Sequence, residues 1–152
     1  MSYVDLHVHS NASDGTLSPE QVVRLAHEAG LSAIALTDHD TTAGVAGAAE
    51  AGAELGLEVV PGIEVSSSFR DHEIHILGLF VNTDSPSLQA ALKEFRHHRD
   101  QRNQEMLGRF DAHGIHLTAE DLCAGNPDTV ITRAHVARAL LAKGLGPDLD
   151  HI

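Results

Sequence analysis

Short apolar runs alternate with helix-like segments through the first 81 residues, and this order constrains the fold more than any other sequence feature. Strand-like runs rich in Val, Ile and Leu lie at 3–8, 32–37, 57–66 and 73–81. Helix-like segments at 17–30 and 43–56 separate the first three runs. Buried strands that alternate with helices are typical of a parallel sheet, either open or closed into a barrel. We therefore expect an α/β fold with four parallel strands.

The segment after the first strand carries a full set of helix signals. Ser18 is a favourable N-cap, Pro19 suits the first helical position, and Gln21 completes a capping box. Apolar residues then recur at helical spacing, and Gly30 follows as a helix terminator. These signals predict an amphipathic helix that packs against the sheet.

The alternation stops after Val81. Residues 85–114 carry apolar residues among many charges, as expected of one long helix. Two shorter helix-like segments follow at 117–125 and 131–144, with Thr118 and Thr132 as N-caps. We expect residues 1–81 to form the first half of an α/β barrel and residues 82–152 to form an all-helical subdomain.

Composition narrows the function classes. The chain has 22 Asp and Glu against 10 Lys and Arg, a formal net charge of -12, and 3% aromatic residues. Such a chain is poorly suited to long nucleic acids, which are bound by basic and aromatic side chains. A single cysteine, Cys123, excludes an intramolecular disulfide and a Cys-based zinc site. Since no signal-peptide pattern and no apolar run of about 18 residues occurs, we expect a cytoplasmic protein without a membrane segment.

Histidines and acidic residues gather at the ends of the predicted strands. His7 and His9 lie two positions apart, so both project from one face of the first strand. Similar residues mark the first loop and the other strand ends, namely Asp14, Asp38, His39, Asp40 and Glu64, and His75 lies in the fourth strand. Because ligands bind outside the carboxyl ends of strands in parallel α/β folds, we expect these side chains to meet at one rim.

The donor types at this rim predict a metal site. Imidazole and carboxylate ligands without thiolates suit Zn, Mn or Fe. About seven donors exceed the needs of one ion, so we expect two or three divalent ions. Such ions lower the pKa of a shared water and neutralise charge on a phosphoryl group. They would also let an acidic protein bind an anionic substrate.

Five stretches of the sequence together resemble one family: "DLHVHSNASDGTLSPEQVV", "LTDHD", "PGIEVS", "HILG" and "TRAHVARAL". The set resembles the PHP (polymerase and histidinol phosphatase) family, specifically stand-alone metal-dependent phosphoesterases related to nucleoside 3',5'-bisphosphate phosphatases. The resemblance implies a distorted (β/α)7 barrel with a helical insertion after the fourth strand. It also implies a trinuclear site that usually holds Mn, Zn or Fe.

The resemblance implies roles for individual residues. The implied metal ligands are His7, His9, Asp14, His39, Glu64 and His75, with His135 as a further ligand or substrate contact. The implied catalytic residues are Asp14, His39, Arg133 and His135. Arg99, Arg102 and Arg133 would bind a phosphate that is not hydrolysed. Asp38 and Asp40 would support the ligands from behind.

The expected activity is hydrolysis of a terminal phosphate of a small nucleotide, such as the 3'-phosphate of a 3',5'-bisphosphate. A 5'-to-3' exonuclease on short oligonucleotides is the alternative, and sugar or amino-alcohol phosphates such as histidinol phosphate are a further option. A non-catalytic metal-binding or assembly module is an alternative of another class. Family members resume the barrel after the insertion and add a late Asp-x-His pair, whereas this sequence stops at Ile152. We therefore expect a second chain or a missing C-terminal half to complete the barrel.

Overall fold

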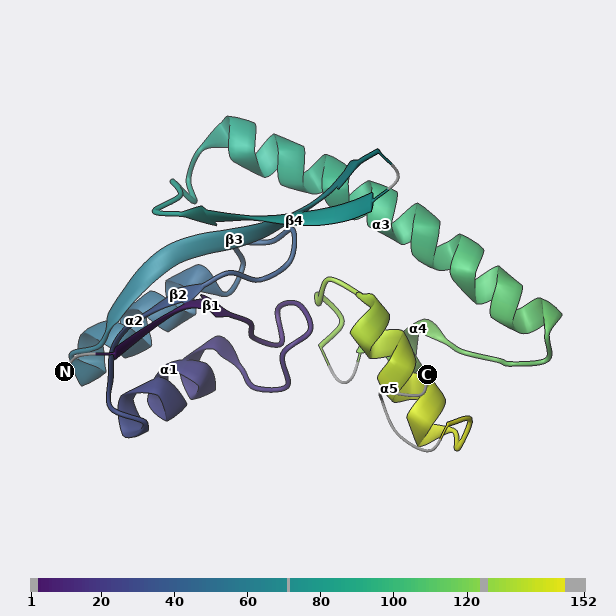
Figure 1. The fold of residues 1–152 in the computed structure, drawn as a ribbon, viewed down its shortest axis with the longest axis horizontal. Coiled ribbons are helices and arrows are strands. Elements are labelled where there is room, and N and C mark those ends of the chain that lie inside the picture. The colour runs from purple at the N-terminus through teal and green to yellow at the C-terminus, as the bar shows by residue number, and fades with distance from the viewer. Residues whose placement is uncertain (1–2, 71, 124–125, 147–152) are drawn as a thin grey trace.

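The computed structural model describes residues 3–70, 72–123 and 126–146, which form a curled sheet with helices (Figure 1). The α/β class is confirmed. The elements in chain order are β1 (Tyr3–Val8), α1 (Pro19–Glu28), β2 (Leu31–Leu36), α2 (Val45–Leu55), β3 (Glu58–Phe69), β4 (His72–Leu79), α3 (Pro86–Ala112), α4 (Ala119–Cys123) and α5 (Arg133–Ala142).

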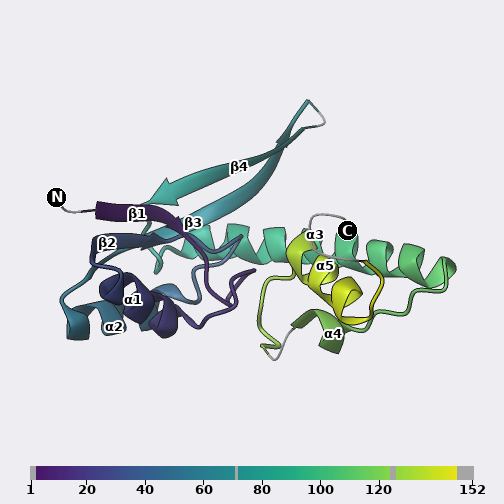
Figure 2. The same ribbon diagram turned by 60° about the horizontal axis from the view of Figure 1, so that its bottom comes forward.

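The four strands lie in sequence order, and the first three are parallel. The expectation of four parallel strands is wrong for the fourth, because β4 pairs antiparallel to β3 from Gly62 opposite Leu79 to Phe69 opposite His72. Only residues 70–71 separate the two strands, whereas a parallel return needs a crossover of about a dozen residues. β3 and β4 therefore form a long hairpin that projects from the rest of the sheet (Figure 2).

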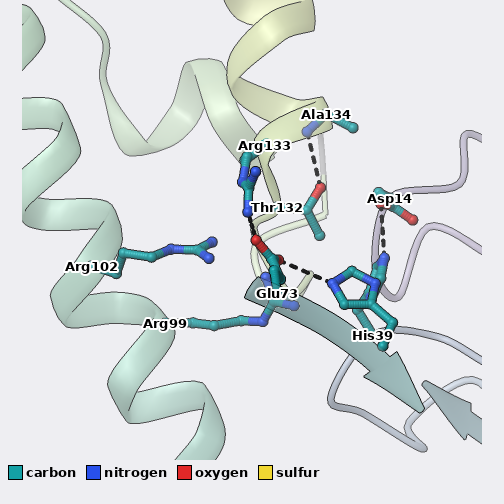
Figure 3. A pocket seen from close by; sticks show the side chains of 9 residues that line it. Asp14, His39, Glu73, Arg99, Arg102, Thr132, Arg133 and Ala134 are labelled. Atoms are coloured by element: carbon teal, nitrogen blue, oxygen red, sulfur yellow. Dashed lines mark hydrogen bonds and ion pairs between the residues drawn. The ribbon is translucent and has the colours of Figure 1, made fainter. Parts of the chain in front are cut away.

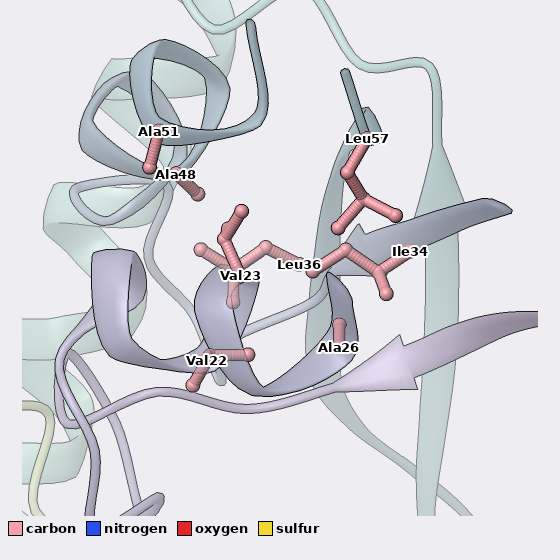
Figure 4. Packing of buried hydrophobic residues seen from close by; sticks show 8 residues of the cluster. All are labelled: Val22, Val23, Ala26, Ile34, Leu36, Ala48, Ala51 and Leu57. Carbon is pink, nitrogen blue, oxygen red and sulfur yellow. The ribbon is translucent and has the colours of Figure 1, made fainter. Parts of the chain in front are cut away.

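Helices α1 and α2 cover one face of the sheet and enclose the first core (Figure 4). Its buried side chains are Val22, Val23, Ala26, Ile34, Leu36, Ala48, Ala51 and Leu57. The predicted capping box is confirmed, since Ser18 Oγ accepts from the Gln21 N–H at 3.3 Å and Gln21 Oε1 accepts from the Ser18 N–H at 2.9 Å. This packing fixes the strands whose ends carry the rim residues.

Residues beyond the sheet are helical and have a core of their own. Buried Leu122, Val136, Ala139 and Leu140 pack with half-buried residues that include Met106 and Phe110. The predicted N-caps are confirmed, because the hydroxyls of Thr118 and Thr132 accept from the Asp121 and Ala134 N–H groups. Helix α3 extends from the sheet to α4 and α5, so it spans both parts of the molecule (Figures 1 and 2).

The two outer strands expose apolar side chains. Tyr3 on β1 is 63% exposed and Phe80, just after β4, is 74% exposed. Other exposed apolar residues on these strands are Val4, Leu6, Ile74, Ile76 and Leu77. Within the described residues, no helix combines the length and the apolar character that crossing a bilayer requires.

Candidate metal centre

Six predicted ligands converge where β1 and β2 end and where β3 and β4 pass. Glu64 was expected at the end of the third strand but lies in the middle of β3, because that strand continues to Phe69. They form three overlapping groups, in each of which the ligand atoms lie within 4.8 Å of one another. The groups are His7, His9 and Glu64; His9, Asp14 and His39; and His39, Glu64 and His75. Because His9, His39 and Glu64 each belong to two groups, the three clusters form one continuous site.

Glu64 lies at the centre of this site and is buried. Its Oε2 atom lies 2.9 Å from His9 Nε2 and 3.0 Å from His7 Nε2, and its Oε1 atom lies 2.9 Å from His75 Nδ1. Burial tends to raise the pKa of Glu64, but the hydrogen bond from His7 and the nearby histidines lower it below the ordinary value. The carboxylate is therefore held ionised among four imidazoles.

Asp14 provides a second carboxylate, on the loop after β1. It contacts His9 Nδ1 at 3.0 Å and His39 Nε2 at 3.3 Å. Burial opposes ionisation, but these two histidines hold the pKa of Asp14 far below its usual range. Burial lowers the pKa of His9, and its contacts with Asp14 outweigh this and raise the pKa overall. Negative charge thus concentrates where cations would bind.

The chemistry of these donors fits divalent metal ions. Among the residues that the structure describes, His39 Nδ1 is buried without a hydrogen-bond partner, and it lies 3.6 Å from Glu64 Oε2, too far for a hydrogen bond. A buried polar atom without a partner is costly, and a metal ion would satisfy it. Imidazole nitrogens and carboxylate oxygens are the donors that Zn, Mn and Fe accept.

Asp38 fixes the loop that carries His9 and Asp14. Its carboxylate is buried and accepts from the Ser10 N–H at 2.8 Å, from Ser10 Oγ at 2.7 Å and from Ser13 Oγ at 2.6 Å. The sequence interpretation did not identify the two serines. The available signal was that each serine lies next to a predicted ligand in the same short loop, Ser10 beside His9 and Ser13 beside Asp14.

Asp40 connects the site to α3. Its Oδ1 atom accepts from the Ser66 N–H at 2.9 Å, and its Oδ2 atom accepts from Arg99 Nε at 2.5 Å. The backbone N–H of Asp40 also donates to the Glu64 carbonyl at 2.9 Å. These bonds stabilise the positive φ of 50° at Asp40, which non-glycine residues rarely adopt.

The three predicted phosphate-binding arginines line one cavity of about 420 Å³ together with Asp14, His39 and His75 (Figure 3). Their surroundings differ. Arg99 is buried and bonded to Asp40 and Ser66, whereas Arg133 is exposed and paired with Glu73. Burial and the charge of Arg99 lower the pKa of Arg102 from its ordinary value. No acidic group within salt-bridge distance of Arg102 occurs among the residues that the structure describes.

His135, which the sequence predicts as a metal ligand or substrate contact, caps the N-terminus of α5. Its Nδ1 atom accepts from the Thr132 N–H at 3.0 Å and forms a capping box for α5. Burial and the nearby Arg138 lower the pKa of His135 below its ordinary value. Over the described ranges, His135 lies outside the three ligand groups.

Glu73 is a site residue that the sequence interpretation missed. It lines the cavity from β4, and its Oε1 atom lies 3.0 Å from His75 Nε2. The available signal was the Glu-x-His spacing, which places both side chains on one face of a strand.

Comparisons with known proteins agree with this geometry. A family model for the PHP domain matches residues 5–144. The 3',5'-nucleoside bisphosphate phosphatase of Chromobacterium violaceum is 39% identical over 151 residues, which are 98% of this chain and 53% of that protein. The 5'-3' exoribonuclease of Haemophilus influenzae is 39% identical over 140 residues, which are 92% of this chain and 51% of that protein.

A solved structure from Bifidobacterium adolescentis, named as a candidate metal-dependent phosphoesterase, superposes with a TM-score of 0.89 at 32% identity. The match covers 98% of this chain and 53% of that one. The chain thus spans about half the length of the curated relatives it matches.

Proposed function

Because this chain belongs to the PHP domain family, we propose that it forms the metal-binding half of a metal-dependent phosphoesterase acting on a small nucleotide. The favoured reaction is removal of a terminal phosphate, such as the 3'-phosphate of a 3',5'-bisphosphate. One observation carries the proposal: three overlapping groups of His, Asp and Glu atoms share one continuous site. The name of the Chromobacterium violaceum relative supports the substrate class.

In this proposal the ligands of two or three divalent ions, Mn, Zn or Fe, are His7, His9, Asp14, His39, Glu64 and His75. Such ions would supply activation of a water molecule and neutralisation of phosphoryl charge. Glu64 holds His7, His9 and His75 at one point, and Asp38 fixes the loop of His9 and Asp14. The chain therefore holds the ligand atoms close together and keeps the charged Glu64 carboxylate buried among them.

In this proposal the three arginines have different roles. Arg102 and Arg133 line the cavity and would bind the phosphate that is not hydrolysed. Arg99 would position α3 and Asp40, because its guanidinium already contacts Asp40 and Ser66. We propose that His135 orders the N-terminus of α5, and with it the neighbouring Arg133, as a hydrogen-bond acceptor.

A 5'-to-3' exonuclease on short oligonucleotides is the second candidate function. The Haemophilus influenzae exoribonuclease is as identical to this chain as the phosphatase is, and the same donors could act on a phosphodiester. In both cases we propose that a further segment, or a second chain, covers the exposed apolar residues of β1 and β4.

Phosphate release by the natural full-length protein tests the proposal. The protein is stripped with a chelator, reloaded with Mn, and given a 3',5'-bisphosphonucleotide or a short 5'-phosphorylated oligonucleotide. Mn-dependent release from the bisphosphonucleotide supports the phosphatase, and release of mononucleotides from the oligonucleotide supports the exonuclease. A folded protein with full Mn content that hydrolyses neither would instead be a metal-binding or assembly module.

A further inference from the structure

Glu73 carries a negative charge on the side of the cavity where, in the proposed function, the phosphate of the substrate would bind. The cavity wall contains Arg99, Arg102 and Arg133, and the Glu73 carboxylate lies beside them (Figure 3). The acid comes from β4 and Arg133 begins α5, so their ion pair crosses the cavity from the sheet to the helical part.

The two carboxylate oxygens of Glu73 have different partners. Oε2 pairs with the Arg133 guanidinium, and Oε1 lies 3.0 Å from His75 Nε2. A phosphate that bound Arg133 in a bidentate way would take the Nη2 donors that Glu73 occupies, because carboxylate and phosphate are both recognised by this fork of donors. Glu73 and a phosphate thus compete for one binding group.

The contrast with Arg99 shows that the Glu73 pair is the displaceable one. The Arg99 side chain is 9% exposed and its partner Asp40 is 1% exposed, whereas Arg133 and Glu73 are 68% and 39% exposed. Exposed ion pairs are weak and easily exchanged, whereas breaking a buried pair leaves an uncompensated charge. A ligand can therefore release Arg133 at little cost but cannot release Arg99.

We infer that Glu73 is an internal competitor that occupies Arg133 in the free protein and is displaced by the substrate phosphate. The inference rests on the proposed function, since it takes the cavity to be a phosphate site. Glu73 reduces the affinity for phosphate in two ways: its pair with Arg133 must break, and its charge repels the incoming anion. Removing its charge strengthens binding, the opposite of the result for a residue that contributes to the site.

Methyl phosphate binding to the Mn-loaded full-length protein, measured by calorimetry at low ionic strength, tests this inference. Glu73→Gln keeps the side-chain size and an oxygen that can accept from His75. We expect it to lower the Kd by about two- to fivefold, the range of an exposed ion pair. In an Arg133→Ala background the same substitution should tighten binding less, because only the charge repulsion is then relieved. Glu54→Gln, an exposed change of equal charge on α2, is the matched control.

Mn content, measured on each variant, separates the two proposals. A wild-type protein that binds no Mn contradicts the proposed metal site. If both proteins have full Mn content, two results overturn the role of Glu73. In one, Glu73→Gln binds methyl phosphate no more tightly than wild type; in the other, neither protein binds it. Loss of Mn from Glu73→Gln also overturns it, because Glu73 would then act through His75. Equal tightening with and without Arg133 also overturns the inference, because Glu73 would then act by charge repulsion alone and not by occupying Arg133.

Discussion

The Nε2 atom of His9 lies 2.9 Å from Oε2 of Glu64, although the two residues come from different parts of the sheet. His9 comes just after β1, and Glu64 lies within β3, with β2 between them in the sheet. The two residues share one ligand group, and each also belongs to one of the other two, so this contact connects all three groups.

Glu64→Gln should weaken Mn binding by at least about tenfold and abolish Mn-dependent phosphate release together. The substitution keeps the side-chain shape but removes the charge that two ligand groups share, and even outer contacts of metal sites contribute about tenfold or more to affinity. Elemental analysis and a metal titration measure the effect. Glu58→Gln, an exposed change on the same strand, should leave Mn affinity unchanged. Full Mn retention by Glu64→Gln would contradict the ligand assignment.

Asp38→Asn should destabilise the protein and weaken Mn binding, because the loop of His9 and Asp14 loses a buried negative charge and one of the two acceptor oxygens that its donors use. Three donors from Ser10 and Ser13 converge on this carboxylate. Hydrogen bonds to a charged group contribute about 1.5–3 kcal/mol each, so we expect a loss of at least about 2 kcal/mol in urea unfolding. Asp84→Asn, an exposed change, should have no effect. Unchanged stability and metal affinity in Asp38→Asn would show that the loop is ordered by other contacts.

Arg99→Ala and Arg102→Ala should have opposite profiles. Removing Arg99 leaves buried Asp40 without its cation and should cost about 3–5 kcal/mol of stability. Removing Arg102 should change stability by less than about 0.5 kcal/mol, but it should weaken methyl phosphate binding. Urea unfolding and calorimetry distinguish the two. If Arg99→Ala instead folds as well as wild type and loses only phosphate affinity, Arg99 is a phosphate ligand rather than a tether.

His135 should make the metal-free protein sensitive to acid. Burial lowers the pKa of His135 from its ordinary 6.5, so at mildly acidic pH the unfolded chain binds a proton that the folded chain resists. The stability should be complete above about pH 6.5 and should fall as the pH decreases toward the folded pKa. His135→Gln keeps a capping acceptor but cannot be protonated, so its thermal unfolding should vary less over this range. Parallel pH profiles of the two proteins would show that His135 does not titrate on unfolding.

Local signals in the sequence predicted the first half of the fold well. The capping box of Ser18 and the Gly30 terminator are short-range features, and they placed α1 within a residue or two. The ligands after β1 and β2 were predictable because strand ends gather at one edge in parallel α/β folds. Glu64 was expected at the end of the third strand, whereas it lies within β3. The described structure brings six of the seven predicted ligands into the three ligand groups, and His135 lies outside these groups.

Other features depended on information that single residues do not carry. The apolar pattern of 73–81 is the same for a parallel and an antiparallel strand, and only the short connection after Phe69 indicates a hairpin. Arg99 and Arg102 share a helix face by spacing, but which of them meets Asp40 depends on how α3 lies against the sheet. The pairing of Glu73 with Arg133 depends on where α5 is placed, which no local pattern predicts.

Anomalous X-ray diffraction from crystals of the full-length protein grown with Mn tests the central claim most directly. The account predicts anomalous peaks within bonding distance of His9, Glu64 and His39, the residues shared between ligand groups. Peaks located elsewhere, or no peak among these side chains at saturating Mn, would contradict the claim that they form a metal centre.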